Sequence, residues 1–305
     1  MAKNKINTRN HRSTISLMNI SPIFFFYCCI LIGFSSCNLI NPKESIPTYI
    51  QIDSVRLLPT VSATHGSISH KITDVWVYYN RQLLGAFELP CKVPVLATET
   101  GQLQVVAGIW DNGLSGTRVK YPFYSVDTFT FAPNPTNIIK HIPTFNYRTT
   151  DTPLVKYFVE DFEQGNVFVK RSGDTTLIKT NQTNEVMEGD WSGLIDLHDS
   201  IESAEVITSL EYFLSPNKEC YMELNYKSEI PFIVRTEVYH LGSYISSDII
   251  GLNAKDKWTK VYINLTGFAA AFQYGKFKFI LKSSLPNSVS HGKIWIDNFK
   301  IIYFN

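Results

Sequence analysis

Residues 220–239 read CYMELNYKSEIPFIVRTEVY, and this stretch decides the fold class. Apolar and polar side chains alternate along residues 220–227 and again along residues 231–239. A period of two is typical of a strand that buries one face and leaves polar groups on the other. The stretch therefore predicts two consecutive strands, each with one apolar face.

The same pattern recurs through the C-terminal half of the chain. Strands are predicted there at residues 166–170, 175–180, 192–198, 205–214, 220–227, 231–239, 244–250, 258–265, 276–283 and 292–304. The one helix expected is short, at residues 267–274. Many strands at intervals of roughly 8–15 residues are typical of a β-sandwich or a jelly roll. We therefore predict a jelly-roll domain over residues 157–305.

Strand signals also mark the N-terminal half, at residues 49–52, 55–58, 75–79, 103–106 and 126–131. No window there keeps apolar residues at helical spacing for three turns. Residues 132–156 are instead rich in proline, which removes backbone donors and favours extended conformation. The sequence thus predicts an all-β protein with two β-sandwich domains, 47–131 and 157–305, joined by this Pro-rich connection.

The smaller domain resembles a known type of β-module. Residues 75–80 make the first strand, Gly85 centres the second, Pro90 follows, and a return strand begins at Gly101. This order of parts is similar to that of PEGA and immunoglobulin-like modules. The resemblance implies a small β-domain that acts as a spacer or as an interaction module.

Four motifs carry a second resemblance, in the larger domain. They are Glu160-Asp161-Phe162-Glu163, Gly189-Asp190-Trp191-Ser192-Gly193, the strand that starts at Trp258, and Ile294-Trp295-Ile296-Asp297-Asn298-Phe299. Together they resemble the galactose-binding-like jelly rolls that include many carbohydrate-binding modules. Because function sits in sites placed on a fold, the resemblance supports the fold well and ligand binding only loosely.

This resemblance also implies a structural calcium ion near the junction of the first and last strands of the domain. Asp161, Glu163 and Asp297 would supply the hard oxygen ligands that calcium prefers. The alternative is that Asp297 and Asn298 form a bulge or turn, while Asp161 and Glu163 are solvated edge residues. The sequence leaves both interpretations open.

A glycan site is predicted on the polar side of the jelly roll. Alternation places these residues on the outward side of three strands: Glu223, Asn225, Arg235, Glu237, Tyr239, Tyr262 and Asn264. Sugar sites combine an aromatic face with a few polar groups that fix the orientation of the ligand. The alternative is that these residues form the ordinary hydrated outer face of a sandwich.

A secretory signal peptide is predicted at residues 1–36, where a basic start precedes an apolar run from Ile20 to Phe34. Two serines and Cys37 follow, which resembles a bacterial lipoprotein signal. The resemblance implies that Cys37 is lipidated and that residues 37–46 tether the protein to the outer membrane, on its surface or periplasmic side. The alternative is an uncleaved anchor, although roughly 15 apolar residues are fewer than the about 20 that span a bilayer.

The net charge of the chain and the motifs that it lacks exclude several classes of function. Four of the 28 basic residues and none of the 27 acidic ones lie in residues 1–36, so the remainder carries a formal charge of −3. Such a chain has no electrostatic footprint for nucleic acid, and no catalytic or phosphate-binding motif is present. We predict a non-catalytic, lipid-anchored envelope protein that binds a glycan or acts as a scaffold through the jelly roll, with no cofactor apart from the calcium ion. The alternative is an assembly lipoprotein, such as a fimbrial or envelope-complex subunit, that binds protein partners.

Overall fold

The computed structural model describes residues 44–60, 65–148 and 155–305, and nearly all of its regular structure is β-strand. Residues Pro47–Asn305 form one compact unit. The predicted signal peptide, Cys37 and most of the predicted tether lie outside the described residues. Within the described residues, no helix is both long and apolar enough to cross a membrane. The prediction of an all-β fold is confirmed.

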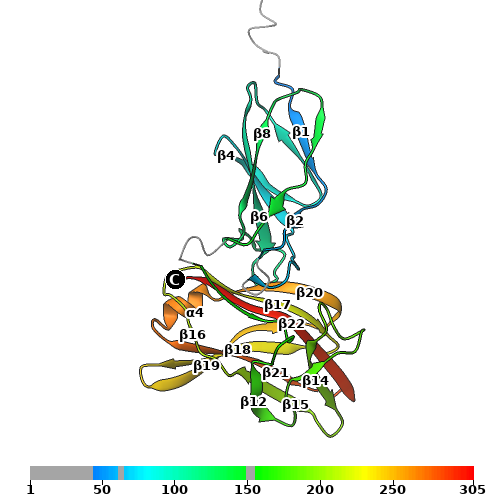
Figure 1. The fold of residues 1–305 in the computed structure, drawn as a ribbon, viewed down its shortest axis with the longest axis vertical. Helices are drawn as coiled ribbons and strands as arrows, with labels where there is room; N and C mark the ends of the chain where they lie inside the picture. The colour runs from blue at the N-terminus through cyan, green and yellow to red at the C-terminus, as the bar shows by residue number, and fades with distance from the viewer. Residues whose placement is uncertain (1–43, 61–64, 149–154) are drawn as a thin grey trace, which may run out of the picture. The chain divides into compact units, whose positions relative to one another are not determined.

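The described residues between 47 and 148 form the N-terminal sandwich (Figure 1). Its buried apolar side chains form one hydrophobic cluster, which also includes Val155, Tyr221, Tyr262 and Ile302 of the C-terminal domain. Its larger sheet runs β4 (Gln82–Glu88), β3 (Asp74–Tyr79), β6 (Gly101–Trp110) and β7 (Arg118–Lys120), with β8 (Val126–Phe131) also paired to β6. Its other sheets are β5 (Cys91–Val95), β1 (Thr48–Ile52) and β9 (Ile138–Lys140), and the pair β10 (Thr144–Phe145) and β2 (Arg56–Leu57). The alternating burial of β1 shows why these residues form a strand, since every second side chain enters the core.

The segment 132–156, predicted as a connection, belongs largely to the N-terminal sandwich. Its two short strands, β9 and β10, pair in parallel with β1 and β2. Pro143, which lies between them, does not prevent this, because each strand is only two or three residues long and lies at a sheet edge. Residues 138–145 therefore contribute strands to the N-terminal sandwich, and the next described strand is β11 (Val155–Glu160).

The C-terminal domain is a sandwich of two six-stranded sheets. The first sheet, here called the covered sheet, runs β13 (Ile178–Thr180), β14 (Ser192–His198), β22 (His291–Phe304), β17 (Cys220–Ser228) and β20 (Lys255–Asn264), with β11 paired to β22. The second, the open sheet, runs β12 (Phe168–Gly173), β15 (Ser203–Thr208), β21 (Lys276–Ser284), β18 (Phe232–His240) and β19 (Ser243–Leu252), with β16 (Tyr212–Phe213) paired to β21. The short helix α4 (Thr266–Ala271) lies at one end of the sandwich (Figure 1). Each predicted strand and the predicted helix has a counterpart here.

A second hydrophobic core fills the space between these two sheets. In β18 the buried positions alternate, so Phe232, Val234 and Val238 enter the core while Arg235 and Glu237 face outward. Strand β22 differs because nearly all of its side chains are buried on both faces. The outward side of the covered sheet must therefore be shielded by something other than water.

Candidate functional site

The seven residues predicted to form one ligand-binding face lie on two different sheets. Four belong to the covered sheet, on β17 and β20: Glu223, Asn225, Tyr262 and Asn264. Three belong to the open sheet, on β18: Arg235, Glu237 and Tyr239. Alternation states which side of its own sheet a residue faces, and the outer sides of two stacked sheets point in opposite directions. The prediction of a single face is therefore wrong.

Glu223 is completely buried on the outer side of the covered sheet. Its carboxylate lies 2.6 Å from Nζ of Lys260 and 3.5 Å from Nζ of Lys300. Tyr121 and Tyr147 of the N-terminal sandwich each donate a hydrogen bond of 2.6 Å to it. Burial acts to raise the pKa of Glu223, but the lysine charges and these hydrogen bonds outweigh burial and hold the pKa at about 2. Glu223 is a charged anchor between the two sandwiches.

The other three predicted residues of the covered sheet also contact the N-terminal sandwich. Tyr262 accepts a hydrogen bond from the backbone N–H of Lys71 (3.1 Å), and Asn225 donates one to the hydroxyl of Ser69 (2.8 Å). The backbone N–H of Asn264 donates to the side-chain oxygen of Asn112 (2.8 Å). This face is occupied by protein, so the prediction that these residues form an exposed glycan site is corrected.

The open sheet carries exposed aromatic side chains on its outer side. Tyr244 is 66% exposed, Tyr239 39% and Phe213 57%. The strand register aligns them, because Tyr244 lies opposite Tyr239, Tyr239 opposite Lys276, and Lys276 opposite Phe213. We call these four residues the aromatic row. Since neighbouring strands are about 4.8 Å apart, the row extends for about 14 Å across four strands.

The members of the aromatic row also contact one another. The rings of Tyr239 and Tyr244 lie 5.0 Å apart, centroid to centroid, and are tilted by 51°. The ammonium group of Lys276 lies 5.8 Å from the ring centroid of Phe213, within the range of a cation–π interaction. The row therefore presents apolar ring surface and a positive charge together, on rigid strands and in contact with solvent.

Arg235 and Glu237 belong to a group of ion pairs next to the aromatic row. Arg171 pairs with Glu205 and, at 2.6 Å, with Glu237. Arg235 pairs with Asp248 and lies 3.7 Å from Glu205. These charges neutralise one another within the protein. Of the three residues predicted on β18, Tyr239 is therefore the one most available to a ligand.

Phe213 and Tyr244 are site candidates that sequence reasoning misses. Tyr239 and Tyr244 are equally far from a two-residue turn, Leu241 and Gly242, whose φ angles are both positive. A two-residue turn fixes which residues of the two strands lie opposite each other. The pairing of Tyr239 with Tyr244 could therefore have been predicted from the sequence. The position of Phe213 carried no such signal, because β16 meets β21 across some sixty residues of chain.

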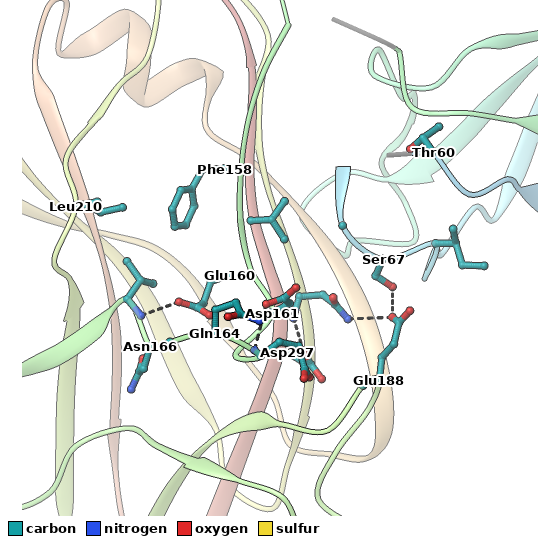
Figure 2. Close-up of a pocket in the computed structure, with 18 of the residues that line it drawn as sticks. Thr60, Ser67, Phe158, Glu160, Asp161, Gln164, Asn166, Glu188, Leu210 and Asp297 are labelled. Carbon is teal, nitrogen blue, oxygen red and sulfur yellow. Dashed lines mark hydrogen bonds between the residues drawn. The ribbon is translucent and has the colours of Figure 1, made fainter. Parts of the chain in front are cut away.

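A pocket of about 910 Å³ lies between the two sandwiches, at the start of the C-terminal domain (Figure 2). Phe158 and Leu210 form its apolar end, away from Ser67 and Glu188. Glu188 accepts hydrogen bonds from the hydroxyl of Ser67 and, at 3.4 Å, from the side-chain amide of Asn298. Of the described residues that line the pocket, five carry a carboxylate and none is basic, so the pocket disfavours anions.

The three predicted calcium ligands, Asp161, Glu163 and Asp297, all line this pocket. One oxygen of Glu163 already accepts from the backbone N–H groups of Asp190 and Trp191, and one oxygen of Asp297 accepts from the hydroxyl of Ser192 at 2.6 Å. Burial raises the pKa of Asp297 to about 7. Within the described ranges, no group of three or more His, Cys, Asp or Glu side chains is arranged to hold a metal ion. Calcium binding stays a prediction.

No protein-family model matches the chain, and no curated protein matches it. Among solved structures, it is similar to a family 61 carbohydrate-binding module in complex with β-1,4-galactotriose, with 14% identity over 49% of this chain and 88% of that one and a TM-score of 0.28. It is also similar to a variant of a family 29 carbohydrate-binding module, with 12% identity over 48% of this chain and 92% of that one and a TM-score of 0.34. At these scores the function has to be argued from the residues of this chain.

Proposed function

We propose that this protein is a non-catalytic glycan-binding lipoprotein of the bacterial outer membrane, and that the aromatic row is its binding surface. The observation that carries the proposal is the alignment of Phe213, Tyr239 and Tyr244, all exposed, across neighbouring strands. An aromatic ring can pack on the apolar face of a sugar ring. A row of about 14 Å suits an extended oligosaccharide better than a single sugar.

The arrangement of carboxylates on this face favours binding over hydrolysis. Glycoside hydrolysis requires two carboxyl groups that flank a bond, one of them able to donate a proton. Glu205 and Glu237, the carboxylates nearest the middle of the open sheet, are both held by Arg171. Both carboxylates are therefore already engaged by a cation of the protein itself.

Attachment to the membrane through Cys37 is part of the proposal. It rests on the basic start, the short apolar run and the serines before Cys37. Several acyl chains on one cysteine anchor a protein stably, whereas one chain does not. Cys37→Ser should move the protein from the membrane to the soluble fraction, and intact-mass spectrometry should find acyl chains on the wild type alone. An unprocessed amino terminus in the wild type would refute the anchor.

The binding proposal is tested with a soluble form that starts at Pro47, since residues 47–305 form one compact unit. The C-terminal domain alone is a poor choice, because it would expose Glu223, Lys260 and Lys300. We expect the unit to bind at least one extended polysaccharide on a glycan array, and Tyr244→Ala to weaken the binding by roughly thirtyfold. Binding that persists in Phe213→Ala, Tyr239→Ala and Tyr244→Ala would show that the row is not the site.

The second candidate function, assembly with a protein partner, is favoured by one observation. Strand β19 is the edge of the open sheet, and among the described strands it pairs with β18 alone. Its ten residues include one charged residue, Asp248, and no proline or lysine, the residues that usually protect an edge. Ile245 on this strand is 38% exposed. An added strand from a partner would pair here, and Ile245→Lys should block such pairing while glycan binding is unchanged.

A further inference from the structure

We infer that the glycan bound by the aromatic row is anionic, with carboxylate groups, as in a uronic acid polymer. This inference rests on the proposed function and specifies its ligand class. It starts from Lys276, which stands in the row between Tyr239 and Phe213. A sugar that stacks on these two rings places its substituents over the ammonium group of Lys276.

The charge of Lys276 is available to a ligand. Its side chain is 44% exposed, and the one ion pair that it forms with a described residue, Glu211, has a long separation of 3.4 Å. Exposed pairs of this kind contribute little free energy, because water and salt screen them. A ligand carboxylate can therefore replace Glu211 as the partner of Lys276 at a small cost in free energy. The charge-assisted hydrogen bond from Lys276 to this carboxylate is stronger than a hydrogen bond from Lys276 to a neutral hydroxyl of the sugar.

A second lysine lies beside the row. Lys278 is opposite Glu237 in the strand register, and Glu237 is opposite Ser246, which defines a second line of side chains next to the first. Glu237 is already held by Arg171 at 2.6 Å, and Lys278 forms no ion pair with any residue that the structure describes. The surface under a bound glycan thus has an excess of positive charge.

The contrast with the pocket strengthens the inference. The pocket is lined by five carboxylates, including Asp161 and Glu188, whereas the aromatic row contains a lysine and no carboxylate. The described part of the protein therefore separates the surface that suits an anion from the surface that repels one. Of these two surfaces, the aromatic row is the one that favours binding of an acidic polysaccharide.

The experiment compares each acidic polymer with its uncharged ester and with neutral polysaccharides. The soluble unit from Pro47 is titrated with alginate and polygalacturonate, with the esterified form of each, and with neutral mannan and galactan. We expect at least about tenfold tighter binding to a carboxylated polymer than to its ester, and weaker binding as salt increases. Tyr244→Ala should weaken the binding by roughly thirtyfold.

The lysines are tested with a matched control. Lys276→Gln/Lys278→Gln should reduce the preference for the carboxylated polymer to less than about threefold. Lys282→Gln should leave it unchanged, because Lys282 lies on the same strand and face but six residues from Lys276, about 20 Å along the strand. Equal binding of polymer and ester, weakened in Tyr244→Ala, would overturn the anionic ligand and keep the glycan site. Failure to bind any of the polysaccharides would overturn both.

Discussion

The two outer faces of the C-terminal sandwich have similar side chains and opposite surroundings. Both carry glutamate, lysine and tyrosine at outward positions of neighbouring strands. On the covered sheet Glu223, Lys260 and Lys300 are at most 3% exposed, whereas on the open sheet Tyr239 is 39% and Tyr244 66% exposed. The comparison teaches that a polar strand face can bind another domain as readily as it faces water.

The charged groups on the two faces also contribute differently to stability, because those on the covered sheet are buried and those on the open sheet are partly exposed. Charges on the covered sheet have lost their hydration, so each depends on a partner that is close and well oriented. Glu223 meets this requirement with two lysines and two tyrosine hydroxyls. The ion pairs of Arg171 and Arg235 remain partly hydrated and screened by salt. Equal substitutions on the two faces should therefore have unequal effects.

The largest effect is expected for Glu223→Gln, which keeps the size of the side chain and removes its charge. Lys260 and Lys300 would remain buried without a counter-charge, so the free energy of unfolding should fall by about 3–5 kcal/mol. The matched variant on the open sheet, Glu237→Gln, should cost less than about 1 kcal/mol. Urea denaturation of both variants measures this, and equal losses would contradict the proposed difference between the faces.

The jelly roll was predictable because its evidence is local. Alternation along 220–227 and 231–239 is a property of each strand, and it placed Phe232 and Val234 correctly in the core. The motifs that contain Asp161 and Asp297 were also brought to one pocket, as their resemblance implied. The first feature depends on residues within one strand. The second depends on the first and last strands of the domain, which are paired in one sheet.

The two outer faces were not predictable, because their difference depends on distant parts of the chain. Glu223 is buried by Tyr121 and Tyr147, which lie some eighty to one hundred residues earlier. Phe213 joins the aromatic row through pairing of β16 with β21. Alternation reports neither contact, so a polar face looks the same in sequence whether it meets water or a second domain.

The pH dependence of stability should also be larger for the covered sheet than for the open sheet. The folded-state pKa of Glu223 is about 2, below its usual value of 4.5, so its contribution is present above pH 4.5 and is lost as the pH falls toward 2. A shift of this size corresponds to about 3 kcal/mol. Urea titrations between pH 2 and 5 should show this loss in the wild type and in Glu237→Gln, but not in Glu223→Gln.

At alkaline pH, Lys300 on the covered sheet should affect the pH dependence of stability more than a lysine on the open sheet. Burial lowers its pKa to about 7, although the charge of Glu223 opposes this. The unfolded chain then binds the proton more tightly, so stability should rise as the pH increases from 7 toward 10.5. Lys300→Met should flatten the rise, whereas Lys278→Met on the open sheet should not. A rise of equal slope in both variants would assign it to other groups.

Tyrosine substitutions should separate stability from binding. Tyr244→Ala should change the free energy of unfolding by less than about 0.5 kcal/mol, because the side chain is largely exposed. It should weaken glycan binding by about 2 kcal/mol, or roughly thirtyfold, as expected for an aromatic anchor. Tyr262→Phe should do the opposite, since its hydroxyl bonds to Lys71 and Tyr124 in the interior: a loss of about 1–2 kcal/mol in stability with binding unchanged.

The smallest effect concerns the pocket, which belongs to neither face. If calcium binds at Asp161, Glu163 and Asp297, then calcium at ten times its dissociation constant should stabilise the protein by about 1.4 kcal/mol at pH 8. The effect should shrink at pH 6, because the pKa of Asp297 is about 7 and a proton then competes with the metal. Asp297→Asn should remove the effect, while Asp196→Asn, which lies outside the pocket, should keep it. Thermal unfolding in calcium and in chelator measures it, and identical curves at pH 8 would exclude the three carboxylates as a calcium site.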